Sequence, residues 1–412
     1  MGVKILPAKN INRIRVLHIT SSLKVGGAET VLISLLRALQ NSKSDSPELI
    51  FENTVLYFHA GPKLLELAEL GITAQQVRGK FHQYDPWFLV RLYCLIKLNR
   101  PDIIHSSLWF ANFMARLFGK ILNIPVIATI HSPVSSNTPN SLQGFRTLVD
   151  RLTAHWPQVT VAVSTSTAQQ VQQALPKLKN LVVIVNGIDE LWFDTPVISK
   201  KICRALPTSP RLRRAGTTNV SDTIPANSFV IGTVGRLVPS KNYSNLITSF
   251  ARLYAKYPQL ILIIIGSGEL ELSLKAQVQN LDLSHKIFFV HTTQALDYYQ
   301  YFDCFVQPSY YEGLSMALLE AGLFKLPVVA SANLNLHDVI TNNYNGLLID
   351  PYKLVELELA LEKLILDLKL RKTLGANLLK TVKQDFSLAK MVGAYKKLYL
   401  ECVRVCSKPP TP

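Results

Sequence analysis

The chain has 412 residues and a formal net charge of +16, and 48% of its residues are hydrophobic. A chain of this length exceeds what one ordinary hydrophobic core holds, so two domains are expected. No apolar run reaches the roughly 20 residues that a membrane-spanning helix needs, and residues 1–10 lack the apolar core of a signal peptide. These features predict a cytoplasmic protein, or one that lies peripherally on the inner face of a membrane.

The five cysteines are scattered and form no Cys-x-x-Cys pair, so reduced thiols and no metal site are expected. The excess of basic residues lies mainly in the first half of the chain and between residues 191 and 230. An anionic membrane surface or a phosphate-bearing acceptor explains this excess, and solubility alone explains it as well. Nucleic acid is not expected as a partner, because arginines and aromatic residues do not cluster in blocks.

The first predicted element is a buried parallel strand at residues 15–20, followed by a loop with Gly26 and Gly27 and then an amphipathic helix. Glycines in such a loop let backbone N–H groups approach an anion closely. The pair also suits a tight turn that binds nothing, and the Gly-x-Gly-x-x-Gly pattern of dinucleotide sites is absent. The loop is therefore a candidate anion site.

Strands and helices continue to alternate through the first half. Helices are predicted at residues 62–70 and at Pro86–Asn99, and the second of these mixes aromatic with basic residues. Further strands are expected at residues 54–58, 125–130, 159–163 and 181–185. His131 follows one of these strands, at the carboxyl end where open α/β sheets bind their ligands. A capped or core histidine is the structural alternative.

The second half opens with a strand from Phe229 that runs into a glycine turn and the helix Tyr243–Lys256. Arg236 and Lys241 flank this turn, and two cations beside a helix start suit a diphosphate, whose leaving charge they neutralise. Apolar strands are predicted at Leu260–Ile265 and Ile287–Val290. A long final helix is expected at residues 388–405.

The stretch of residues 304–320 carries two carboxylates. A buried strand runs into a turn that presents Glu312, and a helix opens near Ser315, a suitable N-cap. The free N–H groups at the start of this helix can hold an anion such as a diphosphate. Glu320, about a turn and a half inside the helix, can accept hydrogen bonds from a ribose diol.

These motifs resemble those of a known family. Glu312 and Glu320, in the form Glu-Gly-Leu-Ser…Leu-Leu-Glu-Ala, resemble the EX7E motif of the retaining GT-B glycosyltransferases of family 4. The Gly-Gly-Ala-Glu loop, the Gly-Arg-Leu-x-x-x-Lys-Asn turn and Asn-Gly-Ile-Asp at residues 186–189 resemble further motifs of the family in the same order. The resemblance spans residues 14–405. Ser315, Lys325, residues 333–335 and Asp338 depart from the usual pattern, which affects the expected fine shape of the sugar pocket.

The resemblance implies an α/β protein of the GT-B fold, with two Rossmann-like, doubly wound parallel-sheet domains facing a central cleft. The implied organisation is an acceptor-side domain at residues 1–190, a linker and loop at 191–228, a nucleotide-sugar donor domain at 229–387, and a helix at 388–412 that packs back on the first domain.

The resemblance also assigns roles to single residues. Arg236 and Lys241 would hold the diphosphate, Glu320 the ribose, and Glu312 and His131 would approach the donor sugar. Gly26 and Gly27 would contact the acceptor or the donor phosphates. The remaining donor-binding positions implied by the family pattern are Gly235, Val290, Gly313, Leu314 and Ser315.

The implied reaction moves a hexosyl or N-acetylhexosaminyl unit from a nucleotide sugar, expected to be UDP-linked, to an acceptor hydroxyl with retention. No cofactor is expected, and no metal, because Asp-x-Asp is absent and two cations can supply the charge. Surface polysaccharide, lipopolysaccharide or a lipid-linked glycan is the expected destination. The alternatives are a nucleotide-sugar epimerase or hydrolase on the same fold, a non-catalytic partner that binds nucleotide sugars, and a nucleic-acid binder.

Overall fold

The computed structural model describes residues 13–41, 49–81, 84–131, 141–189, 224–225, 227–292, 294–332 and 336–406. The chain divides into two compact units. Unit 1 combines Met1–Val163, Thr167–Gly187 and Leu388–Pro412, and unit 2 combines Ser164–Ser166 with Ile188–Ser387. Most of the expected linker at 191–228, and residues 333–335, lie outside the described residues.

Unit 1 is built on a parallel sheet of seven strands in the order β3-β2-β1-β4-β5-β6-β7. The strands are β1 (Arg13–Ser22), β2 (Ile50–His59), β3 (Thr73–Gln76), β4 (Ile103–Ser107), β5 (Val126–Ile130), β6 (Val159–Ala162) and β7 (Leu181–Val183). The order of the strands reverses between β1 and β4. In open α/β sheets such a reversal creates a crevice at the carboxyl ends of the two strands, and ligands bind there.

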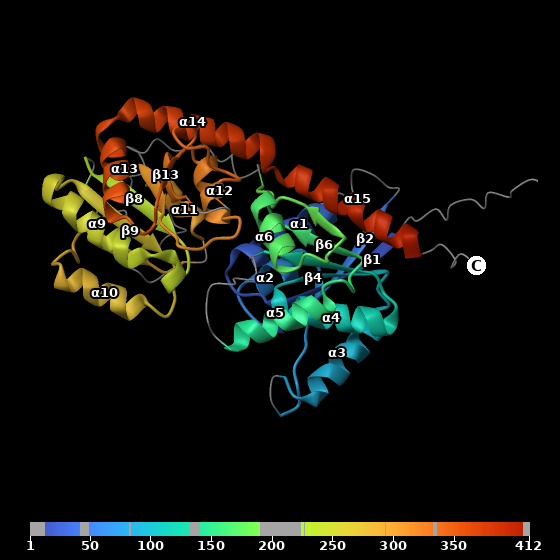
Figure 1. Cartoon of the computed structure of the whole chain (residues 1–412). Coiled ribbons are helices and arrows are strands. Elements are labelled where there is room, and N and C mark those ends of the chain that lie inside the picture. Colours follow the sequence, from blue (N-terminus) through green and yellow to red (C-terminus); the bar gives the residue numbers. More distant parts are fainter. Residues whose placement is uncertain are drawn as a thin grey trace, which may run out of the picture. The chain divides into compact units, whose positions relative to one another are not determined.

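The helices of unit 1 connect these strands (Figure 1). They are α1 (Gly27–Asn41), α2 (Lys63–Glu69), α3 (Pro86–Asn99), α4 (Trp109–Leu122), α5 (Ser141–Thr153) and α6 (Thr165–Ala174). Helix α15 (Leu388–Cys406) also belongs to unit 1 but lies at the end of the chain. Helix α3 has the predicted bounds because Asp85 caps it, accepting a hydrogen bond from the Phe88 N–H, and proline takes the first helical position. At its other end, Arg100 adopts the left-handed conformation with φ 44°.

The last helix of the chain, α15, packs on α1 and β4 of unit 1. Its buried residue Tyr399 holds its hydroxyl 2.7 Å from Nδ1 of His105 on β4. The sheet of unit 1 therefore contacts a segment nearly 300 positions further along the chain, and side-chain hydrogen bonds join the two. Among the described residues, no helix is both long enough and apolar enough to cross a bilayer.

Unit 2 is built on a second parallel sheet, of six strands in the order β10-β9-β8-β11-β12-β13. The strands are β8 (Phe229–Val234), β9 (Leu260–Ile265), β10 (Ile287–Val290), β11 (Cys304–Gln307), β12 (Val328–Ser331) and β13 (Leu347–Ile349). The helices are α9 (Tyr243–Lys256), α10 (Glu271–Asn280), α11 (Leu296–Tyr299), α12 (Met316–Leu323), α13 (Leu354–Leu366) and α14 (Leu368–Asp385), with a 3-10 turn η3 (Pro239–Lys241). The order reverses between β8 and β11.

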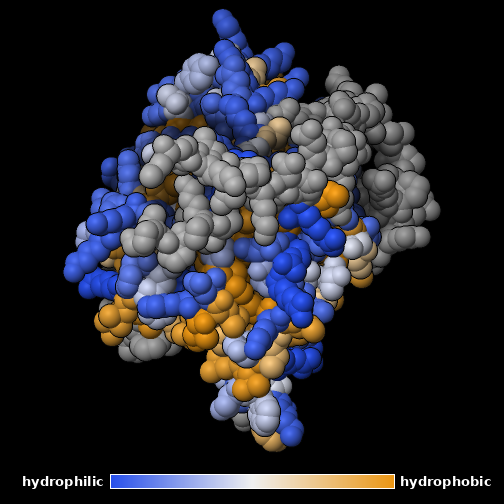
Figure 2. All heavy atoms as spheres, turned by 90° about the vertical axis from the view of Figure 1, so that its right-hand side faces the viewer, coloured by the Kyte–Doolittle hydropathy of each residue, from blue (hydrophilic) through white to orange (hydrophobic). Residues whose placement is uncertain are grey.

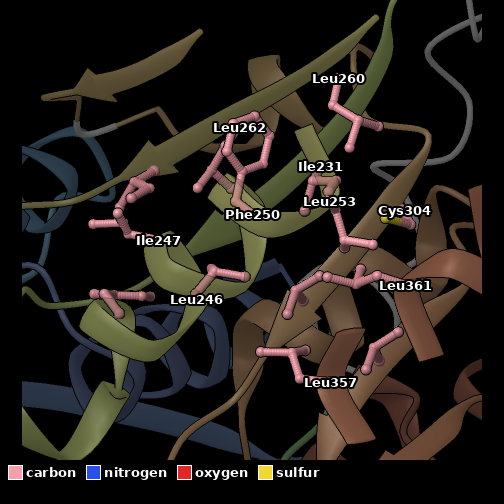
Figure 3. Close-up of a cluster of buried hydrophobic side chains, with 14 of the residues drawn as sticks. Ile231, Leu246, Ile247, Phe250, Leu253, Leu260, Leu262, Cys304, Leu357 and Leu361 are labelled. Atoms are coloured by element: carbon pink, nitrogen blue, oxygen red, sulfur yellow. The ribbon is translucent and has the colours of Figure 1, made fainter. Parts of the chain in front are cut away.

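Both faces of this second sheet are covered. On one face, side chains of α9 and α13, such as Phe250 and Leu361, pack over strand residues that include Leu262 (Figure 3). On the other face, a Cβ added to Gly232 would lie 2.2 Å from the ring of Phe302. Burial on both faces explains why strand β9 reads as an uninterrupted apolar run, Leu-Ile-Leu-Ile-Ile-Ile.

A buried ion pair joins two helices of unit 1. Arg116 of α4 donates from Nη1 to Oδ1 of Asp150 on α5 at 2.6 Å, and the two side chains are only 2% and 5% exposed. The second carboxylate oxygen accepts a hydrogen bond of 3.0 Å from Nε1 of Trp109. Neither charge has water to solvate it, so each depends on the other.

Replacing Asp150→Ala is expected to lower the free energy of unfolding by about 3–5 kcal/mol, because the guanidinium of Arg116 stays buried without a counter-charge. Urea denaturation followed by circular dichroism measures the change. The control is Glu401→Ala on α15, which removes a carboxylate from an exposed pair with Lys397 and should cost about 0.5 kcal/mol or less. Equal losses in the two variants would contradict the role of the buried pair.

Candidate active site

The loops that follow β8 and β11 meet where the strand order of unit 2 reverses. Asn242, at the start of α9, adopts the left-handed conformation with φ 58°. Its side-chain N–H group donates to the backbone oxygens of Pro308 (3.1 Å) and Pro351 (3.0 Å). A further hydrogen bond of 2.8 Å runs from the N–H of Tyr310 to the oxygen of Ser240. The loops are thus tied together at the position where an open α/β sheet binds its ligand.

A carboxylate and a cation face each other across this position. The ammonium of Lys241 pairs with Oε1 of Glu312. The same oxygen accepts hydrogen bonds from the hydroxyl of Ser309 (2.9 Å) and from the amide of Gln307 (2.5 Å). The charged side chains are only 15% and 11% exposed. Three donors therefore orient the Glu312 carboxylate, and the carboxylate in turn holds Lys241 at the crevice.

Helix α12 begins beside this cluster. Ser315 is its N-cap, as predicted, and the hydroxyl accepts a hydrogen bond of 3.3 Å from the N–H of Leu318. Within the part of the chain that the structure describes, the N–H groups of Gly313, Leu314 and Ser315 donate to no acceptor. Unpaired N–H groups at a helix start carry partial positive charge and bind anions. Together with Lys241 they make this edge a candidate anion site.

Glu320, the second carboxylate of the motif, is held by a hydrogen bond from a neighbouring helix. The hydroxyl of Tyr299 donates to Oε2 of Glu320 at 2.7 Å. Burial, followed by the charge of Glu320, raises the pKa of Tyr299 well above its ordinary value, so the phenol keeps its proton and remains a donor. This hydrogen bond fixes the rotamer of Glu320 on α12.

The glycine turn after β8 is shaped by its neighbours. A Cβ at Gly235 would lie 2.7 Å from the hydroxyl of Tyr243, and one at Gly266 would lie 1.9 Å from the oxygen of Gly235. Gly266 also has φ +148°, which side chains disfavour. The turns after β8 and β9 therefore approach backbone to backbone. Arg236, in the first turn, is exposed, and its side chain forms no ion pair or hydrogen bond with any described residue.

Val290 lies at the end of β10, in register with Ile265 and, through it, with Val234. It belongs to the same carboxyl edge but stands two strands away from β8. The structure thus brings Lys241, Glu312 and the start of α12 together. Arg236 and Val290 lie along the same edge without contacting that cluster.

In unit 1 the Gly-Gly loop has a local structural reason. A Cβ at Gly26 would lie 2.4 Å from Oε2 of Glu29, and the other oxygen of that buried carboxylate accepts a hydrogen bond from Ser22 at the end of β1. Gly27 is the first residue of α1. Gly26 therefore makes room for Glu29, whatever the loop binds.

His131 follows β5, as predicted, and is one of three histidines at neighbouring strands. His18 on β1 and His105 on β4 lie with ring centroids 5.3 Å apart. Burial lowers the pKa of His18 and of His131 to about 4 and that of His105 well below its ordinary value. All three are neutral at pH 7. His131 is partly exposed, and its ring has no hydrogen-bond partner among the described residues.

Several contributors were absent from the sequence-based prediction. Gln307 and Ser309 stand five and three positions before Glu312, a spacing that could have suggested contact across a tight turn. Tyr299 gives no such signal, since it reaches Glu320 from another helix. Leu108, which follows β4 at the strand reversal of unit 1, has φ 74°. Backbone strain of this kind in a non-glycine residue is concentrated at functional sites.

Two protein-family models match this chain, one in each half. The family model described as Glycosyltransferase Family 4 matches residues 25–190. The model described as Glycosyl transferases group 1 matches residues 218–381. The two matches follow one another along the chain and together cover most of its 412 residues.

Individual relatives carry consistent names. The chain is 25% identical over 333 residues to the UDP-Gal:alpha-D-GlcNAc-diphosphoundecaprenol alpha-1,3-galactosyltransferase of Escherichia coli, a match that covers 76% of this chain and 79% of the relative. It is 31% identical to the capsular polysaccharide biosynthesis glycosyltransferase CapM of Staphylococcus aureus, over 39% of this chain and 43% of CapM.

Among solved structures, HepE of Anabaena in complex with UDP and glucose superposes with a TM-score of 0.79 at 20% identity, covering 94% of this chain and all of HepE. Two parallel-sheet units, each with a reversal of strand order, together with this likeness define the GT-B fold. The chain belongs to the family 4 glycosyltransferases of this fold, and it is a transferase of that class.

The buried histidines predict a dependence of stability on pH. Because the pKa of His18 is about 4 in the folded chain and about 6.5 when unfolded, the unfolded chain takes up the proton first. The contribution of His18 to the free energy of unfolding is therefore fully present above pH 6.5 and is lost as the pH drops toward 4. The loss attributable to this residue is about 2 kcal/mol at pH 5.

Urea denaturation at pH 7.5 and pH 5 tests this. In His18→Gln the difference between the two free energies of unfolding should be smaller than in the wild type by about 2 kcal/mol. The same change at the exposed His155 serves as the control and should leave the difference unaltered. An unchanged difference in His18→Gln would show that the residue is not held neutral.

Proposed function

We propose that the protein transfers a hexosyl or N-acetylhexosaminyl unit from a UDP-sugar to a hydroxyl of its acceptor, with retention of the anomeric configuration. The observation that carries the proposal is the convergence of Lys241, Glu312 and the start of α12 at the strand reversal of unit 2. A cation with unpaired N–H groups suits a diphosphate leaving group, and a carboxylate suits a sugar that gains positive charge.

The donor site acts through charge. When the bond between the anomeric carbon and the diphosphate oxygen breaks, negative charge grows on the diphosphate. Lys241 lies ready to stabilise it, because Glu312 holds the ammonium at the crevice. Arg236 is the proposed second cation, since its exposed side chain is committed to no other partner among the described residues. Glu312, oriented by Gln307 and Ser309, is proposed to favour the oxocarbenium-like sugar.

The remaining assignments stay predictions. Glu320, oriented by Tyr299, is proposed to accept hydrogen bonds from the ribose diol, and Val290 to lie near the base. The role of His131 at the donor sugar is a prediction, as is contact of Gly26 and Gly27 with acceptor or phosphate. The neutral state of His131 fits a ring that exchanges hydrogen bonds with sugar hydroxyls.

The names of the relatives support the choice of substrates. The Escherichia coli relative is named for a UDP-galactose donor and a lipid-diphosphate-linked acceptor, and HepE was solved with UDP-glucose. We propose the same classes here, namely a UDP-sugar donor and a glycan or lipid-linked acceptor in surface polysaccharide, lipopolysaccharide or lipid-linked glycan synthesis. The proposed location is the cytoplasm, peripheral to the membrane. Activity is expected without a metal, because Lys241 and Arg236 supply positive charge.

Thermal denaturation with UDP, GDP, ADP and their common sugars, with and without Mg²⁺, tests the donor class. Ligands that bind the folded chain raise its stability by mass action, by about 2.7 kcal/mol at 100 times the dissociation constant. UDP and a UDP-sugar should stabilise the wild type equally with or without Mg²⁺, and Arg236→Ala should lose most of this effect. Stabilisation by GDP or ADP alone, or by no nucleotide, would overturn the proposed donor.

Lys241→Ala should reduce the rate of transfer about 10²–10³-fold, because one preorganised donor to the leaving charge is lost. Release of UDP with a glycan acceptor, measured with the sugar donor that stabilises the wild type, is the assay. Lys372→Ala, which removes an exposed lysine on α14, is the matched control. A rate near that of the wild type would exclude the role of Lys241. UDP binding without any transfer by the wild type would favour a non-catalytic partner.

A further inference from the structure

An open cavity of about 540 Å³ lies in unit 1, away from the strand reversal. It is lined by Gln75 and Gln76 at the end of β3, by Arg78 just beyond, and by Arg91 and Leu95 on α3. Strand β3 is at the edge of the sheet, and two strands separate it from β4. The cavity is therefore distinct from the crevice between β1 and β4.

The two arginines of this cavity have no counter-charge among the described residues. Both residues are exposed, and neither side chain forms an ion pair or hydrogen bond with any other residue in the described ranges. Elsewhere in unit 1, Arg15, Arg37 and Arg116 each pair with a carboxylate. Two guanidinium groups that share one hollow without a counter-charge are suited to an anion, and guanidinium geometry matches the oxygens of a phosphate.

The helix beside the cavity exposes a large apolar surface. On α3, Trp87 is 52% exposed, Val90 50% and Leu98 75%. Their helical spacing places them on the same side as Arg91. Helix α3 contains no acidic residue. Figure 2 shows hydrophobic surface at the height at which α3 lies in Figure 1.

The start of α3 continues this surface. Phe81, just before the helix, is 75% exposed. The ammonium of Lys80 lies 5.4 Å from the centroid of the Phe81 ring and 5.7 Å from that of Trp87. Aromatic rings flanked by basic groups are typical of the boundary between lipid headgroups and acyl chains, where one end of the side chain is apolar and the other is hydrated.

We propose that the cavity at Arg78 and Arg91 binds the phosphate headgroup of a membrane lipid while the exposed side of α3 lies in the interface of the bilayer. The aliphatic residues Val90 and Leu98 favour this partner over nucleic acid, whose binding uses basic and stacking groups but gains little from exposed aliphatic side chains. The unmatched arginines favour an anionic lipid surface. The proposal deepens the membrane location in the proposed function, but the binding itself needs no donor or transfer chemistry.

Sedimentation of the full chain with vesicles tests the proposal. The vesicles contain phosphatidylcholine alone, or phosphatidylcholine with phosphatidylglycerol, at 0.1 M salt and without nucleotide. The wild type should bind the anionic vesicles much more tightly than the neutral ones. In Arg78→Ala/Arg91→Ala, binding to anionic vesicles should weaken about 30-fold, which corresponds to about 1 kcal/mol for each basic residue near the surface.

The control for charge is Lys369→Ala/Lys372→Ala on α14, which removes two exposed lysines of unit 2. This variant should bind vesicles like the wild type. Equal weakening in the two double variants would show that only net charge matters, and it would overturn the site. Circular dichroism of each variant verifies that the fold is kept.

A second variant addresses the apolar side. Trp87→Ser/Leu98→Ser keeps all charges and changes two exposed residues, and it should weaken vesicle binding at least 10-fold. Unchanged binding would overturn insertion of α3. Inorganic phosphate at 10 mM distinguishes the source of the anion. If it stabilises the wild type against heating through Arg78 and Arg91 while vesicles fail to bind, the cavity takes free phosphate and the lipid proposal is wrong.

Vesicle binding and UDP binding are measured separately on the wild type, so that either proposal can fail alone. Vesicle binding without stabilisation by UDP would support the proposed membrane contact of α3 and contradict the proposed UDP-sugar donor. Stabilisation by UDP without vesicle binding would support the UDP-sugar donor and contradict the membrane contact.

Discussion

The reversal of strand order in the middle of each sheet is the constraint on which the candidate site depends. In unit 2 it places the loops after β8 and β11 side by side at the carboxyl edge, where open α/β sheets bind their ligands. Asn242 bridges those loops from a left-handed backbone position, and Lys241 and Glu312 then meet across the crevice. Without the reversal, a helix crossing over the sheet would cover this edge.

The ion pair at this crevice differs from the one that joins α4 to α5. Arg116 and Asp150 are almost completely buried, and Trp109 of the same fold donates to the second carboxylate oxygen, which suits a structural role. Lys241 and Glu312 are more exposed and lie beside backbone N–H groups that have no acceptor among the described residues. A cation held by a carboxylate in such a place can exchange part of that contact for an anionic ligand at modest cost, because both states keep it paired.

Much of the fold was predictable because its elements are strongly patterned. The bounds of α3, α9, β9 and β10 follow from capping residues, helical periodicity and uninterrupted apolar runs. Strand β3 was not predicted, since its residues Thr-Ala-Gln-Gln give no apolar signal and backbone pairing with β2 holds it in place. Among site residues, Lys241, Glu312 and Ser315 were located from the spacing of their motifs. The contact of Tyr299 with Glu320 was not predicted, and neither was the lack of a side-chain partner for Arg236 among the described residues.

Local sequence patterns were enough to predict the alternation of strands and helices, the glycine turns, the N-cap of α12 and the positions of both glutamates. These are local properties, set by periodicity and by backbone preferences over a few residues. Three contacts became visible in the folded chain alone: Lys241 meets Glu312, 71 positions away, the hydroxyl of Tyr399 reaches His105, and Arg78 and Arg91 share a cavity. Strand order and helix packing bring these residues together, and neither is set by local sequence, because both depend on how distant apolar faces bury one another.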